Sequence, residues 1–389
     1  MINSAKRIGA SGKTTAILAA LVVGGLSACG NGNSGTTVKA PAATNTPAVN
    51  NKGLWIANGT NVLEYVPSQL AGGTSAATPH LVISSAVFGS PQGVTFDAHG
   101  NLWVMDPKGM VNGFATPALF EFNAAQLAAL KTNPKPEPIA TITSTALKFP
   151  QQSVFDSQGN QWVTDHNNDT VLVFTAAELA RSGTNSTMPA VIISSAEFNG
   201  PLGIAFDVKG NLWVANNGGV PGAKGAISPV GTTIVEFLAA HLSMPPATGM
   251  LTPYLTPDVV LSDDGHKSIQ GPWALTFDST GNLWSSNANP PFTLVELSKT
   301  SLAMTGAPMP AVTLSPTMVN GNATLNSPNG LCFDNVGDLA ATNSAGAFGI
   351  AFFTPTQLTT GAPVPYTFIV GAATTLNAPA GCNFGTLVN

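Results

Sequence analysis

Short apolar runs alternate with polar turns along most of the chain, from about residue 51 to the C-terminus. Residues 201–216, PLGIAFDVKGNLWVAN, show the pattern: an apolar run behind a proline, then Asp-x-x-Gly-Asn, then a second apolar run. The aspartate can accept hydrogen bonds from the backbone of its own turn, and the glycine can adopt a positive φ. The stretch therefore predicts a β-hairpin, whose two strands we call A and B.

This hairpin recurs, and strand B carries a tryptophan in every copy but the last. The tryptophan position holds Trp55, Trp103, Trp162, Trp213, Trp284 and Ala340. After strand B come a third strand C, a short segment of polar residues and alanine that predicts a helical turn, and a fourth strand D. Four short strands in a unit that recurs about every 57 residues predict an all-β propeller of four-stranded blades, with the tryptophans packed between blades.

The two ends of the array are incomplete in complementary ways. Residues 53–58, GLWIAN, form a strand B that lacks its strand A, and residues 379–384, PAGCNF, form a strand A without the rest of a blade. If the ends share one blade, the array has no open edges. We therefore predict six blades over residues 51–389, closed by the C-terminal strand completing the N-terminal blade.

The repeated sequence Pro-x-Gly-Ile-x-Phe-Asp-x-x-Gly-Asn-Leu-Trp-Val-x-Asn resembles the NHL repeat and its relatives in the gluconolactonase/regucalcin and virginiamycin-lyase-like propellers. In the gluconolactonase-like relatives, a divalent metal lies at the mouth of the central channel, and the residue inside Pro-x-Gly supplies some of its ligands. Those positions here hold Gln92, Gln151, Leu202, Trp273, Asn329 and Ala380. Only Asn329 is of the preferred ligand type, and none is a carboxylate, so we predict no metal and no other cofactor there.

The N-terminus predicts export. A basic segment precedes the apolar residues 16–23, which are too few for a typical spanning helix, and residues 26–29, LSAC, resemble a bacterial lipoprotein box. The resemblance implies that residues 1–28 are a removed signal peptide and that Cys29 is lipidated. Gly30 follows instead of an aspartate, which in a Gram-negative cell favours the outer membrane or cell surface. Cleavage without lipidation is the alternative.

Residues 29–50 contain almost no large apolar side chains and predict a flexible tether. Without the signal peptide the chain has 11 positive and 19 negative side chains, which does not favour nucleic acid or an anionic membrane surface. Only 8% of its residues are charged, which suits an exported all-β protein. We expect a monomer in the bacterial cell envelope that meets the membrane only through its lipid anchor.

Two cysteines remain besides Cys29. Cys332 lies four residues after the proline of its strand A, whereas Cys382 lies three residues after the proline of the closing strand. Opposite parity places the two side chains on opposite sheet faces, and neighbouring blades pack face to face, so the two could meet. A disulfide that stabilises the closure and a pair of small buried residues remain equal alternatives.

Long loops predict which face recognises a partner. In an up-and-down blade the B–C and D–A loops share one face, and the A–B turns lie on the other. Residues 216–232 form a long B–C loop, and residues 263–271 and 315–327 form long D–A loops, whereas all A–B turns are short. Variation in loop length on a rigid scaffold marks the B–C/D–A face as the expected recognition face.

Two acid–histidine pairs lie on that face. His166 follows Asp165, and His266 follows residues 263–265, DDG. A histidine beside a carboxylate can bind a metal or act in acid–base catalysis. However, Asp165 occupies an Asn/Asp position found in every blade, where the side chain is expected to satisfy backbone groups, and DDG is typical of a turn. We therefore favour a structural interpretation of both pairs.

The sequence favours a non-catalytic scaffold that binds a protein, a glycan or a small molecule, and it predicts no catalytic residue. The expected contributors are Gln92, Gln151, Trp273 and Asn329 at the channel mouth and His166, Asn217 and His266 in the loops. Trp273 either stacks on a ligand or fills the channel. The alternative function is a metal-dependent lactonase, hydrolase or lyase that uses the same central funnel.

Overall fold

The computed structural model of the chain describes residues 52–218, 232–242 and 252–386. The predicted signal peptide at residues 1–28, Cys29 and the predicted tether at residues 29–50 lie outside the described residues, as does most of the B–C loop at 216–232. None of the helices in the described ranges has the length and hydropathy needed to cross a membrane.

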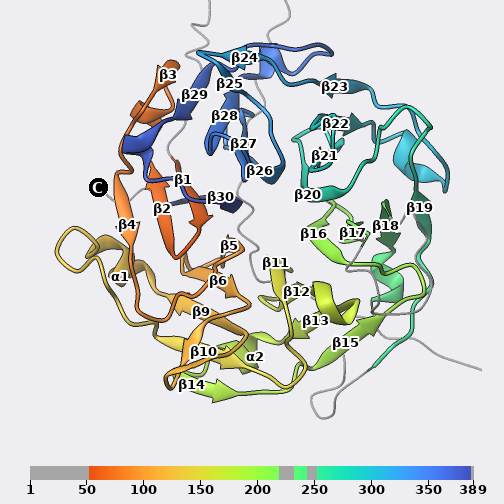
Figure 1. The fold of residues 1–389 in the computed structure, drawn as a ribbon. Helices are drawn as coiled ribbons and strands as arrows, with labels where there is room; N and C mark the ends of the chain where they lie inside the picture. Colours follow the sequence, from red (N-terminus) through yellow and green to blue (C-terminus); the bar gives the residue numbers. More distant parts are fainter. Residues whose placement is uncertain (1–51, 219–231, 243–251, 387–389) are drawn as a thin grey trace, which may run out of the picture. The chain divides into compact units, whose positions relative to one another are not determined.

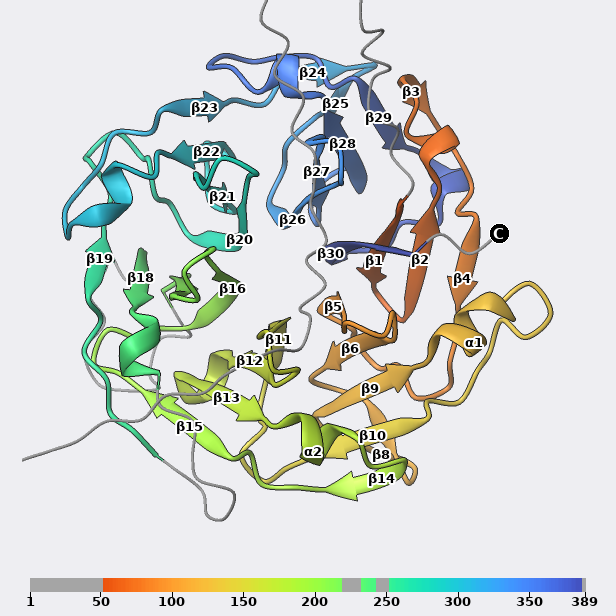
Figure 2. The same cartoon turned by 180° about the vertical axis from the view of Figure 1, so that it is seen from behind.

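Six sheets stand around a central axis as the blades of a propeller (Figures 1 and 2). Blade 1 consists of β30 (Pro379–Thr386), β1 (Lys52–Asn58), β2 (Asn61–Tyr65) and β4 (Leu81–Ile83). Blade 2 consists of β5 (Gly93–Phe96), β6 (Leu102–Asp106), β9 (Ala118–Phe122) and β10 (Ala140–Thr143). Blade 3 consists of β11 (Pro150–Phe155), β12 (Gln161–Asp165), β13 (Thr170–Phe174) and β15 (Val191–Ser194).

The second half of the ring repeats this order, so the predicted fold class is confirmed. Blade 4 consists of β16 (Pro201–Phe206), β17 (Leu212–Asn216), β18 (Thr233–Phe237) and β19 (Val259–Leu261). Blade 5 consists of β20 (Pro272–Phe277), β21 (Leu283–Asn287), β22 (Leu294–Leu297) and β23 (Val312–Leu314). Blade 6 consists of β26 (Pro328–Phe333), β27 (Leu339–Asn343), β28 (Gly349–Phe353) and β29 (Thr367–Val370).

A helical turn follows strand C in every blade, as the sequence predicted. These turns are η1 (Pro67–Gln69), α1 (Ala124–Ala128), α2 (Ala176–Leu179), η3 (Ala239–His241), η4 (Ser301–Ala303) and η5 (Pro355–Gln357). Asn123 and Thr175 cap α1 and α2, each accepting a hydrogen bond from the backbone three residues later. The loops contain η2 (His166–Asn168), η6 (Ala372–Thr374) and the small hairpins β7–β8 (Met110–Val111, Phe114–Ala115) and β24–β25 (Met318–Val319, Asn322–Ala323).

The C-terminal strand closes the ring on the N-terminal blade. β30 pairs antiparallel with β1, with Leu54 opposite Phe384 and Ile56 opposite Cys382. The first and last described strands of the propeller thus complete one sheet, which confirms the predicted closure.

Tight turns join strands A and B. In blade 3, Asp156 Oδ1 accepts hydrogen bonds from the backbone amides of Gln158 and Asn160 at 2.9 Å each, and Gly159 has a φ of 81°. The Asn160 side chain donates to Asp156 Oδ2 at 2.8 Å, and the Trp162 indole donates to the same oxygen at 2.9 Å. The turn aspartate therefore orients both the turn and the packing tryptophan.

The Asn or Asp at the end of each strand B has the structural role that the sequence predicted. Asp165 accepts hydrogen bonds from the amides of Lys148 and Phe149 at 2.6 and 2.9 Å. Asn343 accepts from the Asn326 amide at 2.9 Å and donates to a backbone carbonyl of the same loop at 2.8 Å. These fully buried side chains therefore hold the D–A loops in place.

Aromatic pairs hold neighbouring blades together, as predicted for the tryptophan row. Each tryptophan packs edge-on against the strand A phenylalanine of the next blade, with ring centroids 5.4 to 6.2 Å apart. Phe352 and Phe384 take this place at 6.4 Å between blades 6 and 1, where Ala340 replaces the tryptophan. Such edge-to-face pairs stabilise beyond the burial of their area. The hydrophobic core therefore lies between the blades.

The outer rim carries a belt that the sequence did not predict. The segment between strands C and D of each blade reaches back and hydrogen-bonds to strand D of the blade before it. The fullest contacts are β14 (Gly183–Ser186), parallel to β10, and β3 (Gly73–Ser75), parallel to β29. Shorter contacts are the parallel bridges Ser194–Tyr254, Leu261–Gly306 and Leu314–Gly361 and the bond from Ser84 N to Pro134 O at 2.8 Å. The belt covers every outer edge strand.

Candidate functional site

The innermost strands of all six blades surround the axis (Figure 1). Between them lies a cavity of about 290 Å³. Its lining comprises Gly93, Val94, Thr95, Gln152, Ser153, Val154, Ile204, Ala205, Phe206, Leu275, Thr276, Phe277, Leu331, Cys332, Phe333, Gly381, Cys382 and Asn383. The cavity therefore extends along strand A from the level of Gln152 to the phenylalanines that precede the A–B turns in blades 4 to 6.

Among the described residues, none that lines the cavity has an ionisable side chain, because the two cysteines form a disulfide. Its polar side chains are the neutral groups of Thr95, Gln152, Ser153, Thr276 and Asn383. Small-molecule sites are typically concave and largely apolar, with a few placed polar groups, and this cavity is at the small end of their size range. An unpaired ion is costly to bury. The lining therefore suits an uncharged molecule.

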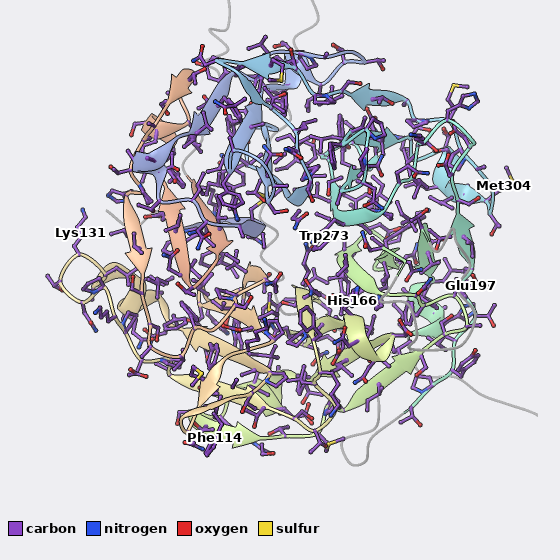
Figure 3. The ribbon with its side chains drawn as sticks, viewed as in Figure 1. Phe114, Lys131, His166, Glu197, Trp273 and Met304 are labelled. Atoms are coloured by element: carbon purple, nitrogen blue, oxygen red, sulfur yellow. A yellow bond between two sulfur atoms is a disulfide. The ribbon has the colours of Figure 1, made fainter. Side chains whose placement is uncertain are left out.

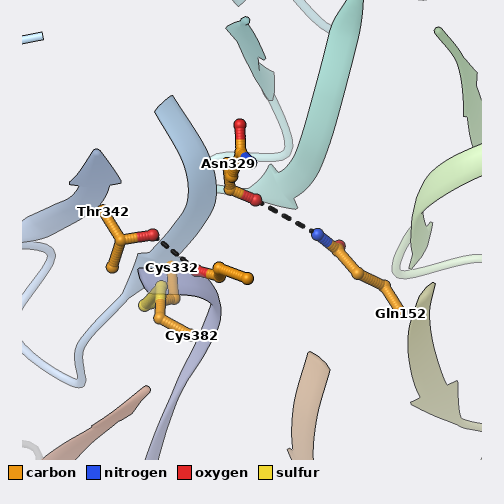
Figure 4. Close-up of a disulfide and its surroundings, with 6 residues drawn as sticks. Gln152, Asn329, Cys332, Thr342 and Cys382 are labelled. Carbon is orange, nitrogen blue, oxygen red and sulfur yellow. Dashed lines mark hydrogen bonds between the residues drawn. A yellow bond between two sulfur atoms is a disulfide. The ribbon is translucent and has the colours of Figure 1, made fainter. Parts of the chain in front are cut away.

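Gln152 lies across the axis. At the equivalent position the other blades have Gly93, Gly203, Ala274, Gly330 and Gly381. Its Nε2 donates to the backbone oxygen of Asn329 at 3.3 Å (Figure 4). Because Asn329 belongs to blade 6 and Gln152 to blade 3, this hydrogen bond joins blades that face each other across the channel. Gln152 thus lies at the level where the cavity begins.

The small residues at the equivalent positions have a packing reason. A Cβ on Gly203 would lie 2.7 Å from the backbone oxygen of Trp273, and one on Gly381 would lie 2.9 Å from that of Gln92. The innermost strands of neighbouring blades therefore approach too closely there for a side chain. Blade 5 has only the methyl group of Ala274 there, whereas Gln152 has a long side chain that points into the channel.

A second polar side chain supports this wall from behind. Gln161 begins strand B of blade 3, where the other blades have leucine, and it is fully buried. Its Nε2 donates to Ser153 Oγ at 2.9 Å, but its Oε1 has no hydrogen-bond partner among the described residues. Ser153 Oγ in turn donates to Met105 Sδ at 3.1 Å. A buried amide oxygen without a partner is destabilising. The glutamine in place of the repeat leucine therefore needs an explanation other than stability.

The disulfide joins Cys332 of β26 to Cys382 of β30, with their Cα atoms 6.0 Å apart (Figure 4). Of the two alternatives left open by the sequence, the structure has the bonded one. Thr342 Oγ1 donates to the Ala380 backbone oxygen beside it. The last complete blade and the closing strand are therefore linked covalently next to the cavity.

The four predicted mouth residues form part of one ring but do not line the cavity. Gln92 donates to Ser90 Oγ at 3.0 Å, while Gln151 and Asn329 are only 3% and 7% exposed. Trp273 is half-buried and lies close to the axis (Figure 3). The cavity begins one or two residues further along each strand. Sequence reasoning therefore missed Gln152 and Ser153, although a glutamine in place of the repeat glycine was a visible signal.

The predicted loop residues lie apart from the cavity. His166 Nδ1 is 3.0 Å from Asn167 Oδ1, and its ring is tilted against Phe149, further from the axis than Trp273 (Figure 3). His266 is exposed, with Nδ1 3.7 Å from Asp264 Oδ2. Asn217 Nδ2 is buried and has no hydrogen-bond partner within residues 52–218, 232–242 and 252–386. No hydrogen bond or ion pair within the described ranges joins these three side chains to one another.

Acidic groups with shifted pKa values also lie outside the cavity. Burial, and then the neighbouring Asp97, raises the pKa of Glu121 to about 7. Burial, and then Asp334, raises the pKa of Asp338 to about 6. Asp334 Oδ2 has no hydrogen-bond partner in the part of the chain that the structure describes. These groups lie in strand C and an A–B turn. Nowhere in the described part of the chain do three or more His, Cys, Asp or Glu side chains gather as a metal site would require.

No protein-family model matches the sequence, and no curated protein matches it. Solved propellers match by structure. The nidogen/laminin complex matches at 14% identity over 87% of this chain and 99% of that chain, with a TM-score of 0.53. A candidate 6-phosphogluconolactonase from Bacteroides uniformis matches at 12% identity over 86% and 99%, with a TM-score of 0.51. Virginiamycin B lyase from Staphylococcus aureus matches at 13% identity over 69% of this chain and 67% of that chain, with a TM-score of 0.40. At these identities the likeness shows the fold alone.

Proposed function

We propose that this chain is an exported, lipid-anchored, NHL-like propeller that binds a small uncharged molecule in its central cavity without transforming it. One observation carries the proposal: all six blades contribute to a cavity, and none of its described lining residues has an ionisable side chain. General acid–base catalysis needs a titratable group near the substrate, and metal-assisted catalysis needs metal ligands. The lining side chains supply neither, whereas neutral polar groups among apolar ones are typical of a binding site.

The export part of the proposal rests on residues 1–29 and is supported by the disulfide between Cys332 and Cys382. Disulfides persist in oxidising compartments such as the bacterial cell envelope. We expect the full chain to fractionate with membranes and a Cys29→Ala variant to lose the lipid, measured as incorporation of labelled palmitate. Equal labelling of both would contradict lipidation at Cys29.

The binding part is tested by melting the purified full chain. Neutral organic compounds are added one by one, and calcium, magnesium or zinc is added in excess after treatment with a chelator. Specific binding at 100 times the dissociation constant stabilises by about 2.7 kcal/mol, which is a visible rise in melting temperature. We expect saturable rises with neutral compounds and none with the ions. A saturable rise with one ion, together with turnover of a lactone, would instead support a metal-dependent lactonase, hydrolase or lyase.

A further inference from the structure

We propose that the blade 3 wall of the cavity, formed by Gln152 and Ser153 with Gln161 behind them, binds the carbonyl oxygen of the ligand. The apolar part of the ligand then lies against blades 4 to 6. This inference rests on the proposed function and names the chemical class of the ligand: an uncharged molecule with an apolar body and one exposed carbonyl group, such as a ketone or an amide.

Gln152 supplies the first donor. One N–H of its Nε2 is used by the 3.3 Å bond to the Asn329 backbone oxygen, which is long for a hydrogen bond. A side-chain amide has two N–H donors, and no second acceptor for this nitrogen is found among the described residues. A carbonyl oxygen in the cavity can therefore be bound by Gln152 without breaking the contact between blades 3 and 6.

Ser153 supplies the second donor. Its hydroxyl accepts from Gln161 Nε2 at 2.9 Å, and it donates to Met105 Sδ at 3.1 Å. A thioether sulfur is a weak acceptor, so rotation of the hydroxyl toward a carbonyl oxygen exchanges a weak hydrogen bond for a stronger one. Gln161 keeps the serine oxygen in place during this exchange. Gln161 therefore contributes to ligand binding by positioning Ser153.

The wall formed by blades 4 to 6 is mainly apolar, with Thr276 as its one polar side chain among the described residues. Ile204, Leu275 and Leu331 come from blades 4, 5 and 6, and Phe206, Phe277 and Phe333 follow two residues later on the same strands. Burial of apolar ligand surface against these side chains supplies the main driving force for binding. Because none of the described lining residues carries a charge, an ionic ligand would lose its hydration without gaining a counter-charge. The polar wall and the apolar wall together select an amphipathic but neutral ligand.

Near-isosteric probes test the proposal on the full chain. Acetophenone and benzamide are neutral carbonyl compounds, benzoate and benzamidine are their charged counterparts, and ethylbenzene lacks the carbonyl group. Methyl-labelled protein reports binding directly, because Ile204, Leu275 and Leu331 line the cavity. We expect acetophenone and benzamide to shift these methyl signals saturably, ethylbenzene to bind at least about fivefold more weakly, and the charged probes to leave the signals unchanged.

Variants then locate the carbonyl contact. We expect Gln152→Gly, which restores the repeat residue, to weaken acetophenone binding about fivefold or more through loss of one hydrogen bond. Ser153→Ala gives a second, independent test if the first variant is too unstable. Gln92→Ala is the matched control: it removes another glutamine near the axis, which bonds to Ser90 and does not line the cavity. The Gln92→Ala variant should bind acetophenone with the same affinity as the protein without substitutions.

The outcomes separate the two proposals. If no probe of any charge shifts the cavity methyl signals, the proposed function fails. If ethylbenzene or a charged probe binds as tightly as acetophenone, or if both variants keep full affinity for acetophenone, the cavity binds ligands but the carbonyl inference is wrong.

Discussion

Blades 3 and 6 face each other across the channel, and each departs from the repeat in its own way. Blade 6 has Cys332 in strand A, Ala340 at the tryptophan position and Asp338 in its A–B turn. Blade 3 has Gln152 in place of a glycine and Gln161 in place of a leucine. A hydrogen bond of 3.3 Å from the Gln152 side chain to the Asn329 backbone oxygen joins the two blades.

In blade 6 other contacts compensate for the departures from the repeat, whereas in blade 3 they do not. In blade 6, Cys332 forms the disulfide with the closing strand, and Phe352 packs against Phe384 where the tryptophan is missing. In blade 3, the buried Gln161 oxygen has no partner and Gln152 projects into the channel. Departures that break a local rule without an energetic gain are typical of functional sites. The departures in blade 6 therefore stabilise the closure of the ring, whereas those in blade 3 are better explained by ligand binding.

The largest effect is expected at the disulfide of blade 6. Replacing both Cys332 and Cys382 with serine removes a bond that spans 50 residues, and we expect the free energy of unfolding to fall by about 2–4 kcal/mol. Denaturant unfolding measures the change. A reducing agent should bring the unchanged chain to the same value and leave the double variant unaffected. Equal stability of the two proteins would show that the bond does not secure the closure.

A smaller effect, of opposite sign, is expected in blade 3. Gln161→Leu restores the repeat residue and removes a buried oxygen without a partner, so we expect the free energy of unfolding to rise by about 1.5 kcal/mol. The matched control is Leu212→Gln, the reverse change at the same position of blade 4, which should destabilise. If Gln161→Leu destabilises as well, the glutamine contributes to stability and the contrast between the blades is lost.

The smallest effect concerns the A–B turn of blade 6. Four other blades have Asn where Asp338 stands, and that amide donates to the turn aspartate, as Asn160 does to Asp156 at 2.8 Å. Burial and Asp334 raise the pKa of Asp338 to about 6. The folded state therefore holds this proton more tightly than the unfolded state, and stability falls as the pH rises from about 4 to about 6.

Asp338→Asn should remove this pH-dependent loss of stability. The new amide should also restore the hydrogen bond to Asp334 Oδ2, which has no partner among the described residues. We expect a gain of about 1 kcal/mol above pH 6, reduced by solvent screening from the full value of the shift, and a smaller gain below about pH 4, where only the restored hydrogen bond contributes. Thermal unfolding of both proteins across this pH range gives the comparison. A gain of the same size at every pH would attribute the effect to something other than the ionisation of Asp338.

The regular parts of both blades could be predicted from the sequence, because each repeated residue has one local task. Asp156 in its turn and Asp165 at the end of strand B act on nearby backbone, so their spacing was sufficient. The contact from Gln152 to Asn329 depends on which strands face each other across the closed ring, and spacing alone does not carry that information. The belt was missed because its segments, such as β14, are short, polar and exposed.

The belt also sets the order in which the propeller can be completed. Each segment reaches back to the preceding blade, so a chain that emerges N-terminus first can finish the rim of one blade only after the next has followed. Blade 1 waits longest, since its innermost strand is β30, and its own segment β3 in turn finishes blade 6. These contacts join residues at the two ends of the sequence, and such non-local pairing slows folding. During synthesis, the first blade must therefore remain incomplete until β30 has emerged.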